Sequence, residues 1–236
     1  MKKILFNSCI IAAIALSGAV QAAPITVNSI FSDWSPTKLD NGAQASYFNT
    51  DGIAGNEEIR WGIPDTSAGQ SGYRFASSTV PINAEVDTAF SLGTFTHFNF
   101  PVYAPSLVNA QLNIGMDFTL NDGTNLNKTF NFLFGHDETS NSGNNNCCND
   151  VVSISNLITT DTFLIDGTHY TLSLSGFLQS GVIVDSFSTV ENKVNQASLV
   201  GQFTEYRQAN VPEPAPLLLF GLGLLSLVGA RRYKAK

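Results

Sequence analysis

Positive charge is scarce in this chain, and much of it lies at the two ends. The 236 residues include 12 Lys and Arg against 19 Asp and Glu. Residues 23–211 hold only six Lys and Arg against eighteen Asp and Glu, which gives a formal charge of −12. Nothing basic remains there to neutralise phosphate groups, and this excludes nucleic acid as a partner. An acidic surface with few charges and much Asn, Ser, Thr and Gly is typical of exported domains.

Cysteine is scarcer still, with three residues in the whole chain. The two that lie outside the N-terminal segment, Cys147 and Cys148, are adjacent. Neighbouring Cα atoms lie about 3.8 Å apart, below the usual disulfide span, so a bond between these two is strained. Three alternatives stay open: a vicinal disulfide, an intermolecular disulfide, or two free thiols, and an oxidising exported setting favours an oxidised form. Without a second Cys pair or a His at ligand spacing, we expect no zinc site.

Helical periodicity is also missing, since no stretch between residues 30 and 205 sustains it for three turns. Short β-branched or aromatic runs alternate there with Gly, Asn and Asp. We therefore expect around ten strands in a single all-β domain, residues 23–210, built as a two-sheet antiparallel β-sandwich that is jelly-roll-like. Asp166-Gly167 predicts a tight hairpin turn. Val190–Leu199 is the segment that could form a short helix.

Three segments place apolar side chains on one face of an extended chain. Their stripes consist of Phe90, Leu92, Thr94, Thr96, Phe98, Phe100 and Val102, then Leu112, Ile114, Met116, Phe118 and Leu120, then Phe130, Phe132 and Phe134. Because strand side chains alternate between faces, each stripe predicts a strand with one face in the core. This pattern places Phe98 in the core, with His97 and Asn99 together on the opposite face.

The N-terminal residues 1–22 have the pattern of a secretory signal peptide. Met1-Lys2-Lys3 is positively charged, Ile10–Leu16 is apolar, and Val20-Gln21-Ala22 offers permissive residues before a cut. Cleavage is expected after Ala22, with Ala23 as the alternative. The rest of the chain is therefore expected to be exported.

Residues 211–236 form a second, C-terminal targeting segment. Val211-Pro212-Glu213-Pro214 leads into an uncharged run over about 216–230, which ends on the basic segment 231–236 with Arg231, Arg232 and Lys234. The run suits a transmembrane helix, although it is shorter than the roughly 20 residues that a bilayer core demands. The basic end is expected to stay on the cytoplasmic side of the inner membrane.

This order of a Pro-Glu-Pro element, an apolar run and an Arg-rich end resembles the PEP-CTERM sorting signal of Gram-negative bacteria. The resemblance implies an exosortase as a partner, which removes the tail at or near Pro212-Glu213-Pro214. It also implies a host that makes extracellular polysaccharide and its biofilm matrix. The membrane helix is then a transient anchor, and the processed protein is expected at the cell surface or in the extracellular matrix.

Thr96-His97-Phe98-Asn99 is the most suggestive polar group of the central domain. The imidazole and amide could bind a sugar hydroxyl or a metal, or could organise a neighbouring loop through its carbonyl groups. No carboxylate or Ser nucleophile is patterned beside them, and this favours the structural role. Thr96, His97 and Asn99 also resemble the hallmark of the THxN subgroup of PEP-CTERM proteins, which overlaps the choice-of-anchor K domain. The likeness implies a surface β-sandwich and no catalytic residue.

Acidic residues flank the polar segment 139–149. Asp137, Glu138 and Asp150 are weak candidates for calcium ligands, because Ca²⁺ takes carboxylate oxygens. Their spacing matches no EF-hand or nonapeptide loop, so a solvated loop is the favoured interpretation and we expect no cofactor.

The sequence contains no hydrolase motif of the Gly-x-Ser-x-Gly or His-Glu-x-x-His type. Trp34, Trp61 and Tyr73 could line a carbohydrate platform, although the alternating aromatics fit core packing better. We expect a non-catalytic structural, adhesive or glycan-binding protein. The alternative is a secreted hydrolase acting on polysaccharide, whose carboxylates come together only in the fold.

Overall fold

The computed structural model describes residues 24–50, 52, 55–139, 149–157, 159 and 161–206. These residues form sixteen strands and no helix, all within a unit that ends at Glu205. The strands are β1 (Ile25–Leu39), β2 (Ser46–Phe48), β3 (Glu58–Trp61), β4 (Ile63–Pro64), β5 (Ser71–Ser77), β6 (Ile82–Ala84), β7 (Phe90–Asn99), β8 (Val102–Tyr103), β9 (Leu107–Thr119), β10 (Asn125–Asp137), β11 (Asp150–Ile154), β12 (Phe163–Ile165), β13 (Thr168–Gln179), β14 (Val182–Val184), β15 (Ser186–Thr189) and β16 (Lys193–Glu205).

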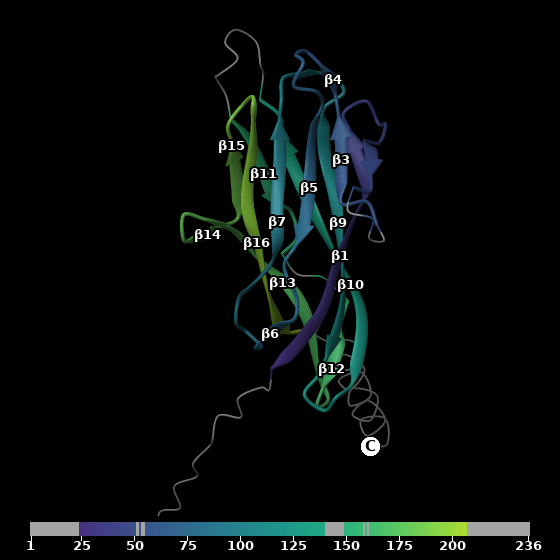
Figure 1. The fold of residues 1–236 in the computed structure, drawn as a ribbon, viewed down its shortest axis with the longest axis vertical. Coiled ribbons are helices and arrows are strands. Elements are labelled where there is room, and N and C mark those ends of the chain that lie inside the picture. Colours follow the sequence, from purple (N-terminus) through teal and green to yellow (C-terminus); the bar gives the residue numbers. More distant parts are fainter. Residues whose placement is uncertain are drawn as a thin grey trace, which may run out of the picture. The chain divides into compact units, whose positions relative to one another are not determined.

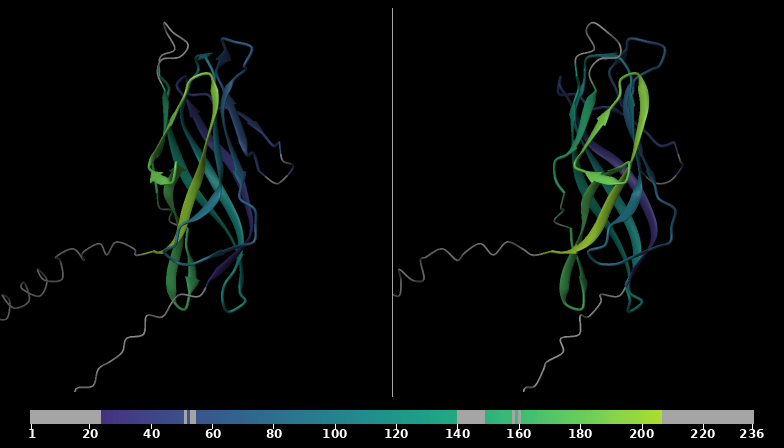
Figure 2. Two further views of the ribbon diagram at one scale, coloured as in Figure 1. Left: turned by 60° about the vertical axis from the view of Figure 1, so that its left-hand side comes forward. Right: turned by 90° about the vertical axis from the view of Figure 1, so that its left-hand side faces the viewer.

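Two antiparallel sheets face each other (Figures 1 and 2). The first, called sheet A, has the strand order β15-β11-β10-β9-β1-β6. The second, called sheet B, has the order β12-β13-β16-β7-β5-β3-β2, with β14 paired to β13. Strands β4 and β8 form a separate ribbon. The predicted two-sheet antiparallel sandwich is confirmed, and the closer likeness to a jelly roll stays a prediction.

Aromatic and aliphatic side chains fill the space between the sheets. The stripes of β9 and β10 are buried as predicted, with exposed fractions of 1% or less for Leu112, Ile114, Met116, Phe118, Phe130, Phe132 and Phe134. Phe95 lies among five other rings, whose centroids are 4.9–6.1 Å from its own: Trp34, Tyr73, Phe134, Phe177 and Phe187. Trp34, Trp61 and Tyr73 are all core residues, so they do not form a carbohydrate platform.

The face prediction for β7 is wrong in its second half. The pairing of β7 with β16 shifts register near Leu92, where Gly93 pairs with Leu199 but Ser91 pairs with Val200. Such an irregularity inverts the alternation of side chains along a strand. Phe95, His97 and Asn99 consequently point into the sandwich, and Phe98 lies half-buried on the outer face.

Charged side chains cover the outward ring of Phe98. The Arg60 guanidinium lies 3.6 Å from the ring centroid, and Glu58 holds both Arg60 and Arg74 in ion pairs. Arginine stacked on an aromatic face packs through its planar guanidinium while it keeps its hydrogen bonds. This local cover explains how a large apolar residue can occupy the outer face.

Two local predictions have opposite outcomes. Asp166 and Gly167 join β12 to β13 with φ angles of 47° and 80°, as a type I′ hairpin turn requires. The short helix expected over Val190–Leu199 is wrong, because Lys193–Glu205 forms β16. This strand has β7 on one side and β13 on the other, so tertiary pairing satisfies its backbone and overrides local preference.

Several predictions lie outside the described residues. These are the signal peptide at 1–22, Cys147 and Cys148, and the C-terminal segment 211–236 with its apolar run. Within the part of the chain that the structure describes, no helix is long and apolar enough to cross a membrane.

Candidate functional site

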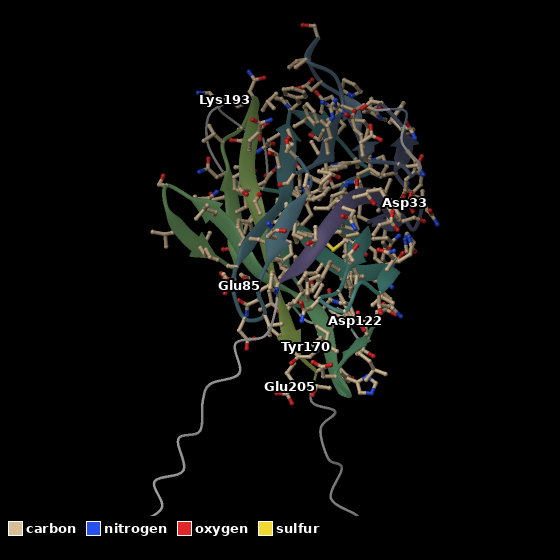
Figure 3. The ribbon with its side chains drawn as sticks, turned by 60° about the horizontal axis from the view of Figure 1, so that its bottom comes forward. Asp33, Glu85, Asp122, Tyr170, Lys193 and Glu205 are labelled. Atoms are coloured by element: carbon tan, nitrogen blue, oxygen red, sulfur yellow. The ribbon has the colours of Figure 1, made fainter. Side chains whose placement is uncertain are left out.

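His97 and Asn99 lie at the end of β7 with exposed fractions of 0%, and both side chains face sheet A. Lys193 and Glu205 mark the two ends of β16 in Figure 3, and the pairing of Asn99 with Lys193 places the site at the Lys193 end. Thr96 alternates to the outer face, where its hydroxyl accepts a hydrogen bond from Gln196. Only two of the three motif residues therefore enter the site.

Thr189, the last residue of β15 in sheet A, receives both of these side chains. His97 Nδ1 lies 2.8 Å from Thr189 Oγ1, and Asn99 Nδ2 donates to the Thr189 carbonyl at 3.1 Å. The Thr189 hydroxyl donates in turn to the Asp150 carbonyl at 3.2 Å. A hydroxyl has one hydrogen, so it must accept from His97, whose Nδ1 therefore carries the proton. His97 thus joins the end of β15 in sheet A to the end of β7 in sheet B.

Because Nδ1 carries the proton, the other ring nitrogen of His97, Nε2, has a free lone pair. His97 Nε2 is buried and has no hydrogen-bond partner among the described residues. Burial lowers the pKa of His97 well below its usual value, and the nearby His136 lowers it further. A neutral imidazole whose lone pair accepts no hydrogen bond is the form that binds metal ions.

His136 reaches the same place from β10 of sheet A. Its side chain is 0% exposed, and its ring centroid lies 5.2 Å from that of His97. His136 Nδ1 lies 2.6 Å from the Tyr73 hydroxyl, and Nε2 lies 3.1 Å from Glu138 Oε2 and 3.9 Å from Asp150 Oδ2. Two histidines from opposite sheets therefore meet edge to face inside the sandwich.

The carboxylates of Glu138 and Asp150 lie beside the His136 imidazole, and Glu191 lies close enough to feel their charges. Asp150 is 0% exposed and Glu191 2% exposed, while the Glu138 side chain is 15% exposed. Burial, followed by the charge of Glu138, raises the pKa of Asp150 to about 6. Burial, followed by the charges of Asp150 and Glu138, raises the pKa of Glu191 to about 7. The carboxylates are thus close enough to disfavour one another's ionised forms.

Several oxygens of these carboxylates are unsatisfied. Asp150 Oδ2, Glu138 Oε1 and both carboxylate oxygens of Glu191 are buried without a hydrogen-bond partner in the described part of the chain. Asp150 Oδ1, in contrast, accepts hydrogen bonds from the amide and hydroxyl of Thr139. The backbone thus holds one oxygen of Asp150 and leaves the other toward His136.

Aromatic side chains wall the site on the sheet B side. The Trp61 ring stacks on His97 with centroids 5.9 Å apart, and Tyr73 meets His97 edge to face at 5.1 Å. Burial, with the charges of Asp150 and Glu138, raises the pKa of Tyr73 well above its usual value, so its hydroxyl stays protonated. Both rings also contact His136, so they pack against the two imidazoles.

The predicted calcium group is only partly brought together. Glu138 and Asp150 join the site, whereas Asp137 is exposed, and the alternation of β10 places it on the opposite face from His136. One ligand atom from each of His97, His136 and Asp150 lies within 4.8 Å of the others.

The sequence analysis did not join His136, Tyr73, Thr189 or Glu191 to His97 in one site. A signal for His136 was present, because it continues the buried stripe of Phe130, Phe132 and Phe134 at the next inward position. Thr189 in the same way follows the inward Phe187 at a spacing of two. Their meeting with His97 depends on the packing of the two sheets and leaves no trace in the spacing.

A second surface lies on the outer face of sheet A. Phe31 of β1 is half-buried there and covers Gly115 of β9, where an added Cβ would collide with the Phe31 ring. Polar side chains surround this ring in rows across β1, β9 and β10. They are Ser29, Asp33, Asn113, Asp117, Asn127, Thr129 and Asn131. We call this set, with Phe31, the sheet A face.

Hydrogen bonds organise part of the sheet A face. Asp117 accepts from the Ser29 hydroxyl at 2.6 Å and from Asn127 Nδ2 at 2.6 Å. These bonds lower the pKa of Asp117 below its usual value, so it stays ionised. A neighbouring hollow of about 270 Å³ is lined by Asn28, Asp117, Phe118, Asn125, Leu126 and Asn127.

The C-terminal segment is the part of the chain that matches a known family model. Residues 210–232 match the PEP-CTERM protein-sorting motif. The motif implies an exported protein that is anchored in the membrane by its C-terminal signal and then processed by an exosortase. A comparison of the chain with curated proteins found no match. The sorting motif therefore describes how the chain is handled and leaves the role of the sandwich to its own geometry.

Proposed function

We propose that the processed protein is a non-catalytic component of the cell surface or extracellular matrix of a Gram-negative, exopolysaccharide-producing bacterium. It contacts polysaccharide through the sheet A face. The sorting motif at residues 210–232 supports the exported location. Membership in the THxN or choice-of-anchor K group is part of the same proposal, and it rests on the sequence likeness of Thr96, His97 and Asn99.

The arrangement around Phe31 is the observation that carries the glycan-binding role. Sugar rings present apolar C–H faces that pack on aromatic rings and hydroxyl groups that pair with amides and carboxylates. Phe31 lies between a row that contains Asp117 and Asn127 and a row that contains Asn113 and Asn131. This pattern offers one apolar contact with hydrogen-bonding groups on either side, along an open strand surface.

The hydrolase alternative has one observation in its favour, the gathering of Glu138, Asp150 and Glu191. Catalytic carboxylates must reach the glycosidic bond from an open cleft. Asp150 and Glu191 are at most 2% exposed, so they do not line an open cleft. Their burial supports a structural role for this cluster.

The test uses residues 23–210, which contain all sixteen strands and correspond to the chain after processing. Binding to polysaccharide purified from the host is measured by pull-down and by calorimetry. Phe31→Ala is expected to weaken binding about fivefold to tenfold, because it removes the stacking contact. Asp117→Ala with Asn127→Ala is expected to weaken it further.

Gln196→Ala, at an exposed amide on sheet B, is the matched control and is expected to bind as the parent does. Equal binding by the Phe31 variant and the control would contradict the role of the sheet A face. Release of reducing sugars from the polysaccharide by the parent protein would establish the hydrolase instead.

A further inference from the structure

We propose that His97, His136 and Asp150 bind one divalent transition-metal ion of the zinc class inside the sandwich, with Glu138 or Glu191 as an additional ligand. The ion would be structural and would join β7 of sheet B to β10 and β11 of sheet A. This site is independent of the glycan-binding face, which lies on the outside of sheet A.

Unsatisfied buried atoms are the first argument. A buried polar group without a partner destabilises the folded state, so such groups are rare in folded proteins. Here His97 Nε2, Asp150 Oδ2, Glu138 Oε1 and both oxygens of Glu191 lack partners among the described residues. All are electron-pair donors or become so on ionisation, and a cation satisfies them together.

The hydrogen bonds on the far side of each imidazole are the second argument. Metal-ligating histidines usually donate their other N–H to a nearby oxygen, which fixes the ring and its tautomer. His97 donates Nδ1–H to Thr189 Oγ1, and His136 Nδ1 lies 2.6 Å from the Tyr73 hydroxyl oxygen. Both rings can therefore present Nε2 to an ion, with His136 exchanging its contact with Glu138 for the metal.

The spacing is close to that of a metal site. The ligand atoms of His97, His136 and Asp150 lie within 4.8 Å of one another, and His136 Nε2 lies 3.9 Å from Asp150 Oδ2. Bonds of 2.0–2.1 Å to tetrahedral zinc place ligand atoms about 3.3 Å apart. Side-chain rotations that shorten these distances by up to about 1.5 Å would complete the coordination.

Charge is the third argument. Glu138, Asp150 and Glu191 together carry up to three negative charges, and among the described residues no Lys or Arg forms an ion pair with them. Buried carboxylates of this kind are usually paired or coordinated to metal ions. A divalent cation offsets their mutual repulsion.

The two imidazoles decide the class of ion. Calcium and magnesium prefer oxygen ligands, whereas imidazole nitrogen favours zinc, copper, nickel and iron. The calcium expectation rested on the carboxylates of Asp137, Glu138 and Asp150, whereas the structure brings the imidazoles of His97 and His136 together beside Asp150. Because the side chains of His97 and His136 are buried, we expect the ion to be structural.

The experiment uses untagged residues 23–210 in which Cys147 and Cys148 are replaced by Ser, so that thiolates cannot bind the ion. After chelation and dialysis, the protein is titrated with Zn²⁺ by calorimetry and with Co²⁺ by visible spectroscopy. One ion per chain is expected, with d–d bands and no thiolate charge-transfer band. Zn²⁺ is expected to raise Tm more than Ca²⁺ at equal concentration, since only the folded state holds the site.

Substitutions of the proposed ligands test where the ion binds. His97→Gln and His136→Gln are each expected to weaken Zn²⁺ binding by at least about 100-fold. His169→Gln, at an exposed histidine outside the site, is the matched control and is expected to bind as the parent does. Asp150→Asn serves as a further variant if a histidine variant does not fold. Absence of Zn²⁺ binding at micromolar concentrations, equal binding by His97→Gln and the control, or an equal effect of Ca²⁺ would overturn the proposal.

Discussion

The Nδ1 atom of His97 lies 2.8 Å from the hydroxyl oxygen of Thr189, and this contact joins the two sheets at one end of the sandwich. The same hydroxyl donates to the Asp150 carbonyl, so one oxygen sets the tautomer of His97 and anchors the start of β11. The Thr189 side chain thus contacts both His97 of the sequence motif and Asp150, which lie about fifty positions apart in the sequence.

Removing this hydroxyl is the most direct test of the site's framework. Thr189→Val keeps the shape of the side chain but removes the hydroxyl. His97 Nδ1 and Asn99 Nδ2 then each lose a buried hydrogen bond to Oγ1. We expect the free energy of unfolding to fall by about 2–3 kcal/mol, measured by denaturant titration. Thr129→Val, at an exposed Thr on β10, is expected to change it by no more than about 0.5 kcal/mol. Equal effects of the two substitutions would show that the Thr189 hydroxyl does not organise the site.

The raised pKa of Glu191 predicts that the stability of the metal-free protein depends on pH. Its pKa is raised from 4.5 to about 7, so the folded state holds the proton more tightly than the unfolded state does. Its contribution to stability is therefore greatest below pH 4.5 and is lost as the pH rises through 7. Glu191→Gln is expected to gain stability relative to the parent between pH 5 and pH 8, on the order of 1–3 kcal/mol.

The comparison between parent and variant isolates Glu191 from its neighbours. Asp150 acts in the same direction, because its pKa is also raised. His97 acts in the opposite direction, since its lowered pKa removes stability as the pH falls below 6.5. Both contributions are present in the two proteins and largely cancel in the difference. Parallel curves of Tm against pH for parent and variant would contradict the assignment.

Phe95 is expected to be among the most sensitive positions of the core. It contacts five aromatic rings from both sheets, so truncation leaves a cavity that the rigid rings cannot fill. Phe95→Ala is expected to lower the free energy of unfolding by about 3–5 kcal/mol, measured by denaturant titration. Phe48, which is 42% exposed, is the control, and its replacement by Ala is expected to cost less than about 1 kcal/mol. A small effect at Phe95 would mean that the packing around it is loose.

The sorting motif predicts the fate of the full-length chain in its host. Replacing Pro212, Glu213 and Pro214 with Ala is expected to leave uncleaved protein in the membrane fraction, because the exosortase recognises this element. Fractionation and immunoblotting measure the result. Ala substitutions at Pro101 and Pro105, within the sandwich, control for the loss of proline and are expected to leave processing intact. Unchanged release of the 212–214 variant would rule out this processing route.

Strand formation could largely be predicted from the sequence. The stripes of Leu112–Phe118 and Phe130–Phe134 repeat every second residue, and only a strand buries such a pattern on one side. Asp166-Gly167 likewise encodes its turn, because few residue pairs accept two consecutive positive φ angles. The two-residue strands β4 and β8 could not be predicted, since two residues carry no periodicity.

The side chains of β7 that point into the core could not be predicted from the alternation of residues alone. Alternation predicts Phe98 inside and His97 outside, but the register shift near Leu92 reverses both. Whether a strand contains such an irregularity depends on its neighbours, here β16. Residue spacing within β7 could not reveal it, and the candidate site was therefore assigned to the wrong side of the strand.

By itself the sequence determined the β-strand character, the acidic surface, and the C-terminal sorting motif, because each depends on composition or on a contiguous pattern. The tertiary structure decided that His97, His136 and Asp150 meet inside the sandwich. They come from three strands in two sheets, and sequence spacing contains no information about which strands pack face to face. It also decided that Phe31 emerges among polar rows on the outside of sheet A, since only the packed sheets define an inside and an outside.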